Sequence, residues 1–188
     1  YAGARAVWLG RKPELVSPDV RTVVKAADGA IWFGMSGGGL GCLQDGKLRQ
    51  FRRADGLSSD FVQCLHLEED DTLWIGTFGG GLNRFKDGRF TAITKNDGLP
   101  NDVICEIQDD GLGFFWISSH GGIARVSKTE LNRCADDRCA DEQAAKLKCL
   151  NYGLSDGLPS LECSGGSKPS GCRTADGHLW FATVKGLV

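Results

Sequence analysis

The stretch Leu73-Trp74-Ile75-Gly76-Thr77, followed by Gly79-Gly80-Gly81-Leu82, is one of four related segments in the chain. Similar segments occur at 31–34, 115–118 and 179–183, and each is followed by a glycine turn that an aliphatic residue closes. The tryptophans of the first three segments are equally spaced along the chain, and the fourth follows after a longer interval. Self-similarity at a fixed period of about 40 residues is the signature of a repeat architecture.

A leucine at a fixed distance before each tryptophan confirms the register of the repeat. Leu15, Leu57 and Leu99 all precede their tryptophan by the same spacing, whereas the spacing from Leu158 to Trp180 is longer by five, which indicates an insertion. The tripeptide Asp-Gly-Leu ends on three of these leucines, at 55–57, 97–99 and 156–158. Several features in register make a chance repetition a poor explanation.

The hydrophobic pattern within one repeat is that of short strands. Residues 62–67 alternate loosely, 73–77 are extended, and 82–85 and 89–93 flank an Asp-Gly turn that is typical of a hairpin. Four short antiparallel strands in each repeat are typical of one propeller blade. The sequence therefore predicts an all-β fold, a β-propeller with roughly four blades in this chain. A β-sandwich is the alternative, but it requires no long repeat with identical turns.

The register divides the chain into blades. We expect residues 20–52, 62–94 and 103–153 to form three blades and 160–188 a partial one, while 4–10 form the closing strand of a preceding blade. The third blade carries an insertion at 127–150, in which Ser127-Lys128-Thr129-Glu130 has capping-box spacing and predicts a short helix. We expect this insertion to project from the blade. The strand at 4–10 is expected to pair with 183–188 of the same chain, with pairing to a second copy as the alternative.

Composition excludes several classes of protein. The chain has 22 Lys and Arg against 24 Asp and Glu, a net charge of −2, which gives no basis for binding nucleic acid or an anionic membrane surface. Glycine is abundant, at 27 of 188 residues, as expected for many tight turns. The sequence contains no apolar run long enough to span a membrane.

Several of these motifs resemble the two-component regulator propeller repeat. They are Leu-Trp-Ile-Gly-Thr, Gly-Gly-Gly-Leu, Asp-Gly-Arg-Phe, Asp-Gly-Leu-Pro-Asn-Asp-Val and Leu-Trp-Phe-Ala-Thr-Val-Lys-Gly-Leu-Val, and the resemblance covers nearly the whole chain. In that family such propellers form the extracytoplasmic sensor of histidine kinases, hybrid regulators or diguanylate cyclases. The resemblance implies a periplasmic or extracellular location, no enzyme activity in this region and a small, often carbohydrate-derived, ligand.

Three residues are candidates for a ligand site. Ser36, Phe78 and His120 each stand four residues after a motif tryptophan, in otherwise matching surroundings. A fixed frame that presents different side chains is typical of a binding surface, with Phe78 suited to stacking and His120 to hydrogen bonding. The alternative is that they fill space between blades. The recurring tryptophans Trp32, Trp74, Trp116 and Trp180 are expected to be structural, each buried against an adjacent blade.

The cysteines and histidines suggest no catalytic or metal site. Cys64 and Cys105 are expected to be reduced core residues. Any disulfide is expected in the irregular region that holds Cys134, Cys139, Cys149, Cys163 and Cys172. No Cys-x-x-Cys pair is present in that region and no order of acid, histidine and nucleophile is apparent, so neither a metal nor a cofactor is predicted.

Three functions of different classes remain open. The first is a ligand-sensing domain of a signalling receptor, which acts by shifting an existing conformational equilibrium. The second is a protein-interaction or homodimerisation platform without a small ligand. The third and weakest is a propeller lyase, for which the sequence supplies no cluster of titratable groups.

Overall fold

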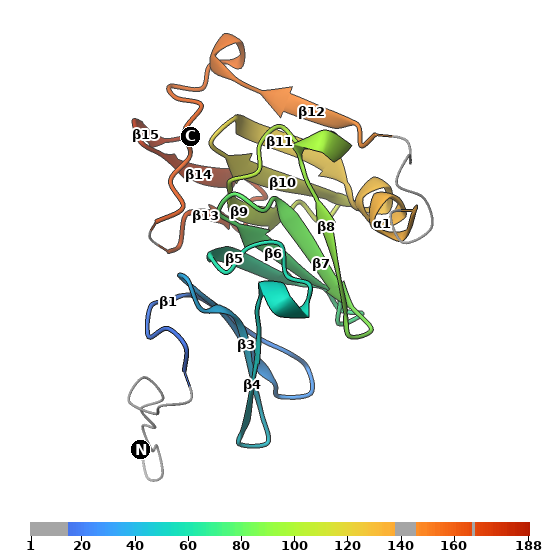
Figure 1. The fold of residues 1–188 in the computed structure, drawn as a ribbon. Helices are drawn as coiled ribbons and strands as arrows, with labels where there is room; N and C mark the ends of the chain where they lie inside the picture. Colours follow the sequence, from blue (N-terminus) through green and yellow to red (C-terminus); the bar gives the residue numbers. More distant parts are fainter. Residues whose placement is uncertain (1–14, 138–145, 167) are drawn as a thin grey trace.

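The computed structural model describes residues 15–137, 146–166 and 168–188, which form a β-propeller of four antiparallel blades (Figure 1). Neighbouring blades contact one another through their first strands. Three blades have four strands: β1 (Val20–Lys25), β2 (Ile31–Met35), β3 (Gly39–Gln44) and β4 (Lys47–Phe51); β5 (Val62–Leu67), β6 (Leu73–Thr77), β7 (Leu82–Lys86) and β8 (Arg89–Ile93); β9 (Ile104–Asp109), β10 (Phe114–Ser119), β11 (Gly122–Ser127) and β12 (Cys149–Tyr152). The fourth has three described strands: β13 (Gly171–Arg173), β14 (Leu179–Thr183) and β15 (Gly186–Leu187).

Local sequence explains the meander within each blade. Consecutive strands pair antiparallel, and the hairpins that join β3 to β4 and β7 to β8 turn on Asp45-Gly46 and Asp87-Gly88. All four of these turn residues have positive φ, between 49° and 75°. Two consecutive left-handed residues match the right-handed twist of the flanking strands, so Asp-Gly fixes the register of each hairpin.

The Asp-Gly-Leu tripeptide lies in the linker between successive blades, where it ends a short 3₁₀ helix and begins the segment that leads into the next blade. Asp55 closes the 3₁₀ helix η1 (Arg53–Asp55), and its carboxylate accepts the N–H of Arg52 at 2.8 Å. Gly56 then adopts φ +105°, and Leu57 enters the core between the first two blades with 2 % exposure. The same arrangement recurs at η2 (Lys95–Asp97) and η3 (Leu154–Asp156).

The motif tryptophans face the following blade. The Trp32 ring lies 5.4 Å from Phe85 of the second blade, and the Trp74 ring lies 5.8 Å from Phe115 of the third. Trp116 packs against the cluster that contains Phe181 of the fourth blade. We call each such contact zone between two blades a seam.

The expected burial of all four tryptophans is wrong at one position. Trp74 is fully buried, and Trp32 and Trp116 are half-buried, but Trp180 keeps 39 % exposure. The physical reason is that each motif tryptophan packs against the following blade, and within the described residues no blade follows the fourth one.

The first part of the insertion forms a helix that packs against the blades instead of projecting from them. Helix α1 (Lys128–Asp137) starts where the capping box predicted, and Ser127 Oγ accepts the Glu130 N–H at 3.4 Å. Its apolar face, Leu131, Cys134 and Ala135, is buried in the core of the seam between the second and third blades. For the helix the expectation of a projecting insertion is therefore wrong, because the spacing of i, i+3 and i+4 gives it an apolar stripe. Residues 138–145 of the insertion lie outside the described part of the chain.

Two expectations concern residues outside the described part of the chain, namely the closing strand at 4–10 and Cys139. Within the described part, no helix is both long and apolar enough to cross a bilayer.

Candidate functional site

One backbone arrangement recurs at the mouth, which we define as the end of the blades where second strands turn into third strands. In each blade, the residue four positions after the motif tryptophan donates its N–H to a carbonyl in the linker that enters the blade. The donor–acceptor pairs are Ser36–Asp19 (2.9 Å), Phe78–Phe61 (2.9 Å), His120–Val103 (3.4 Å) and Val184–Glu162 (3.1 Å).

The pairs explain the spacing found in the sequence. Donor and acceptor are equally far apart along the chain in the first three pairs, and the spacing is longer by five in the fourth, as it is between the leucine and the tryptophan. The inserted residues therefore lie within the linker of the fourth blade and leave its hydrogen bond intact. The mouth is a fixed frame that presents a different side chain in every blade.

Side chains at the mouth form a row across three blades, which we call the mouth row: Ser36, Phe61, Phe78, Val103 and His120. Isolated bridges join Ser36 to Phe61 and Phe78 to Val103. The Phe78 and His120 rings meet edge to face, with centroids 5.9 Å apart. Phe61 and Phe78 remain about half exposed, at 51 % and 49 %. Two large apolar rings exposed on one surface favour an interaction site over space-filling packing.

All three expected residues lie in the mouth row, but only two of them contact each other through their side chains. Phe78 and His120 are in direct ring contact, whereas Ser36 joins them through Phe61, and its carbonyl is occupied by the Ser17 hydroxyl at 2.9 Å. Sequence reasoning missed Phe61. The signal was available, since Phe61 stands as far before Phe78 as Leu57 stands before Trp74.

The row contains side chains suited to binding and few suited to catalysis. It offers two aromatic faces, one aliphatic group, one hydroxyl and one imidazole, with no carboxylate to act as a paired acid or base. Within the described residues, no group of three or more His, Cys, Asp or Glu side chains is arranged to hold a metal ion.

A hollow of about 610 Å³ lies over Trp116 and Tyr152 in the seam between the third and fourth blades. These stacked rings correspond to Trp32 and Phe51 in the first seam, which are stacked in the same way. There the facing space is filled by Phe85 and Phe90 from the third and fourth strands of the next blade (rings within 5.4 to 5.7 Å). The described part of the fourth blade has only a short third strand and no fourth strand, so within the described residues no side chains equivalent to Phe85 and Phe90 fill this hollow.

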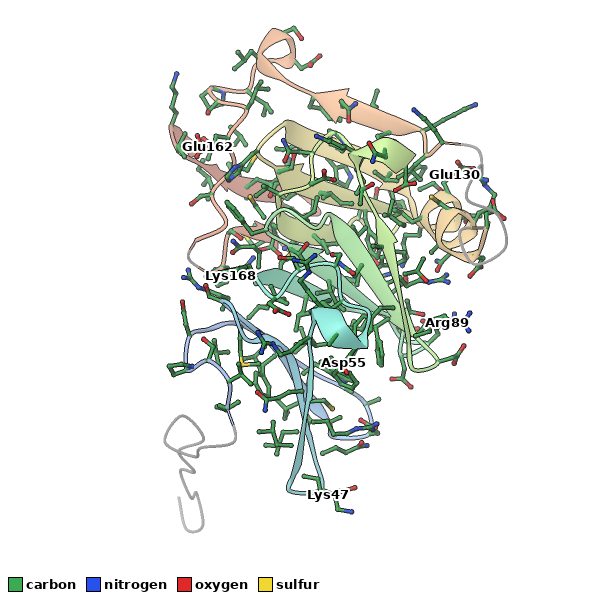
Figure 2. The ribbon with its side chains drawn as sticks, viewed as in Figure 1. Lys47, Asp55, Arg89, Glu130, Glu162 and Lys168 are labelled. Carbon is green, nitrogen blue, oxygen red and sulfur yellow. The ribbon has the colours of Figure 1, made fainter. Side chains whose placement is uncertain are left out.

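A polar cluster connects the third blade to the loop before β13, where Figure 2 labels Lys168. Lys168 Nζ lies 2.7 Å from both Glu106 Oε2 and Ser170 Oγ, and Ser170 donates to Glu106 at 2.8 Å. Arg21 of β1 reaches the Gly166 carbonyl at 2.6 Å on the edge of the same region. The three groups of the cluster hydrogen-bond to one another, so the cluster joins β9 of the third blade to the loop before β13.

The described cysteines show no disulfide between any two of them. Cys134 and Cys149 both pack on the core of the second seam, and burial, with the nearby Cys134, raises the pKa of the Cys149 thiol to about 11. Cys163 is buried, and Cys172 is exposed on β13. Cys64 and Cys105 are both buried, as expected for core thiols.

Comparison with known proteins supports the repeat assignment. Residues 56–79 match the family described as the two component regulator propeller. No curated protein sequence matches the chain significantly. Among solved structures, the extracellular domain of BT3049 from B. thetaiotaomicron, described as a hybrid two component system, aligns with a TM-score of 0.74 at 23 % identity over 93 % of this chain and 22 % of that one.

Two further structures share the fold. The extracellular domain of BT4673 from the same organism, described as a one component system, gives a TM-score of 0.69 at 21 % identity over 89 % of this chain and 23 % of its own. Virginiamycin B lyase from Staphylococcus aureus gives 0.57 at 21 % identity over 90 % of this chain and 54 % of its own. The chain spans about a fifth of the two extracellular domains. Residues 56–79 thus match the two component regulator propeller repeat, and the chain is a four-bladed β-propeller whose fold those extracellular domains share.

Proposed function

We propose that this chain is the sensing part of an extracytoplasmic receptor of the two-component type, and that the mouth row binds its signal molecule. The single observation that carries the proposal is the exposed pair Phe61 and Phe78, held with His120 on a backbone frame that is identical from blade to blade. The likeness to extracellular domains described as parts of a hybrid two component system and of a one component system supports the receptor class and the extracytoplasmic location.

The proposed mechanism is differential binding. A ligand seated on the mouth row contacts linkers that enter the second and third blades, because Phe61 and Val103 both lie in such linkers. A ligand that binds one arrangement of these blades more tightly shifts the population toward that arrangement. The signal then passes to whatever module adjoins the propeller, without any chemical step in the propeller itself.

The test is thermal unfolding of the purified chain with a set of soluble oligosaccharides, chosen because the family resemblance implies carbohydrate-derived ligands. A ligand that binds only the folded state raises the melting temperature in a concentration-dependent way. Phe78→Ala should abolish the shift. Leu112→Ala is the matched control, since Leu112 is an exposed apolar residue away from the mouth, at 77 % exposure, and its loss should leave the shift unchanged. Equal loss in both variants, or none in either, contradicts the assignment of the row.

A second function, homodimerisation, is favoured by a separate observation. The fourth blade exposes Trp180 at 39 %, Val184 at 57 % and Leu187 at 65 %. Exposed apolar groups clustered on one blade are typical of an interaction surface. Light scattering after size exclusion should show a dimer that Leu187→Asp converts to a monomer, while a monomeric wild type at every concentration would dismiss this second function.

A further inference from the structure

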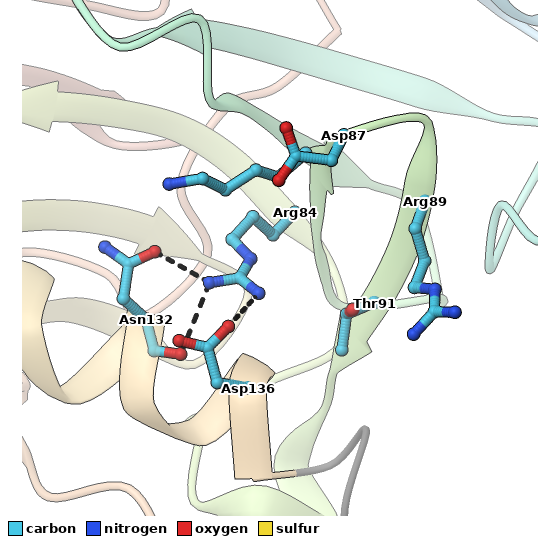
Figure 3. A pocket seen from close by; sticks show the side chains of 7 residues that line it. Arg84, Asp87, Arg89, Thr91, Asn132 and Asp136 are labelled. Carbon is cyan, nitrogen blue, oxygen red and sulfur yellow. Dashed lines mark hydrogen bonds and ion pairs between the residues drawn. The ribbon is translucent and has the colours of Figure 1, made fainter.

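A groove of about 540 Å³ lies on the outer rim of the second blade, away from the mouth (Figure 3). One wall is the hairpin of β7 and β8, and the other is the flank of helix α1. Its lining contains three cations, two carboxylates and two neutral polar groups: Arg84, Lys86, Arg89, Asp87, Asp136, Thr91 and Asn132. No aliphatic or aromatic side chain lines it, so any ligand must be recognised by charge and hydrogen bonds.

Arg84 is the buried centre of this groove. Its side chain is 7 % exposed, and its Nη1 donates to the side-chain oxygen of Asn132 at 2.9 Å (Figure 3). Nη2 bonds to the carboxylate of Asp136. Within the described residues the buried Nε atom has no hydrogen-bond partner. The hydrogen-bonding capacity of Arg84 is therefore used only in part. A buried N–H donor without a partner lowers the free energy of unfolding, which a suitable ligand could offset.

Asp136 is a poorly placed partner for that arginine. Its side chain is 68 % exposed, although the guanidinium that it neutralises is buried. It also lies in the last turn of helix α1, where a negative charge is opposed by the partial negative charge of the helix end. Release of Asp136 from Arg84 therefore changes the hydration of its carboxylate little, because that side chain is already mostly exposed.

The remaining charges of the groove leave one cation available. Lys86 is paired with Asp70 at 2.9 Å, just outside the groove. Arg89 forms no ion pair with any residue in the ranges that the structure describes, and its neighbour Asp87 stands at the hairpin turn. An anion in the groove would thus meet the guanidinium groups of Arg84 and Arg89, which bind planar or tetrahedral oxyanions through paired N–H donors.

We propose that this groove is an oxyanion site, in which the carboxylate or phosphate group of a small ligand replaces Asp136 on Arg84 and is held from the other side by Arg89. Asp136 acts as an internal stand-in for the ligand while the site is empty. Binding exchanges one anion for another on Arg84, with no covalent step. This site is separate from the mouth row, and its failure would leave the proposed sensing function untouched.

The test is calorimetric titration of the folded chain with inorganic phosphate, and in a second arm with acetate, at ionic strength held constant with chloride. Asp136→Asn removes the competing charge and keeps the side-chain shape, so the affinity for the bound anion should rise about three- to tenfold. Arg89→Gln should lower it about fivefold, which corresponds to about 1 kcal/mol for one exposed charged contact. Arg84 is left intact, because removal of a buried guanidinium endangers the fold.

Lys47→Gln provides the matched control. Lys47 holds the same position in the hairpin of β3 and β4 that Arg89 holds in the hairpin of β7 and β8, and both lie near hairpin ends in Figure 2. Helix α1 packs against β8 and β11, and the groove is lined by no residue of the first blade's hairpin. Unchanged affinity in this variant, with the two opposite changes above, supports the site, and the arm that saturates identifies phosphate or carboxylate chemistry. Absence of saturable binding in both arms, a loss of affinity in Asp136→Asn, or equal effects of Arg89→Gln and Lys47→Gln would overturn it.

Discussion

Replacement of Trp74 by alanine should be far more damaging than replacement of Trp180, although both occupy the same position of the repeat. Trp74 is fully buried, and its indole N–H donates to Glu68 Oε2 at 2.7 Å. Truncation of a buried tryptophan costs about 3–5 kcal/mol, and loss of the hydrogen bond adds about 1 kcal/mol. Glu68 keeps its 2.6 Å contact to Lys128, so its carboxylate is not left without a partner. We expect a total of about 4–6 kcal/mol.

Trp180 has no such surroundings. With 39 % of its surface already exposed, its loss should cost about 1–2 kcal/mol from the apolar area that it still buries. Urea unfolding followed by circular dichroism measures both values. At this chain length 1 kcal/mol corresponds to about 2–4 °C, so the melting temperature of the Trp74 variant should fall by roughly 8–24 °C. Trp74→Phe serves where the alanine variant does not fold. Equal costs at the two positions would refute the conclusion that each tryptophan stabilises the fold through the following blade.

Three further outcomes are expected. Burial lowers the pKa of His66, so the unfolded chain binds a proton more readily than the folded chain does. The free energy of unfolding should therefore fall as the pH drops through about 6.5, the unfolded pKa. His66→Gln should flatten this dependence, which urea midpoints measured from pH 7.5 to 5 would show. Gly81→Ala should cost about 2 kcal/mol or more, because its Cβ would overlap a backbone oxygen, whereas Gly88→Ala, at a similar positive φ but in open space, should cost about 1 kcal/mol. In the folded chain, a thiol reagent should label exposed Cys172 within minutes and half-buried Cys149, whose pKa is raised to about 11, far more slowly than in the unfolded chain.

The repeat made most of the fold predictable. The regular period, the Asp-Gly hairpins and the leucine–tryptophan spacing all follow from contacts within one blade or between successive blades, so a single sequence records them. The mouth frame was predictable for the same reason, because a residue at a fixed offset from Trp74 must occupy a fixed place on the blade.

Features outside the repeat were not predictable. The packing of α1 on the second blade depends on Arg84, whose equivalents in the other blades are Cys42 and Arg125, so no periodic signal marks it. The exposure of Trp180 depends on what lies beyond the fourth blade, which its own repeat does not encode. Both are consequences of tertiary neighbours, which override local pattern.

Helix α1 links the second and third blades by polar contacts on their outer side. It is part of the third blade, yet Lys128 at its start bonds to Glu68 of the second blade at 2.6 Å and to Asp109 of the third at 3.0 Å, and its other end is bonded to Arg84. The seam between these blades is thus held by ion pairs on its outer side, whereas the seam before it is joined mainly by apolar side chains. Strain applied at the mouth should therefore open or twist the seam between the first and second blades first, with the second and third blades moving together as one rigid unit.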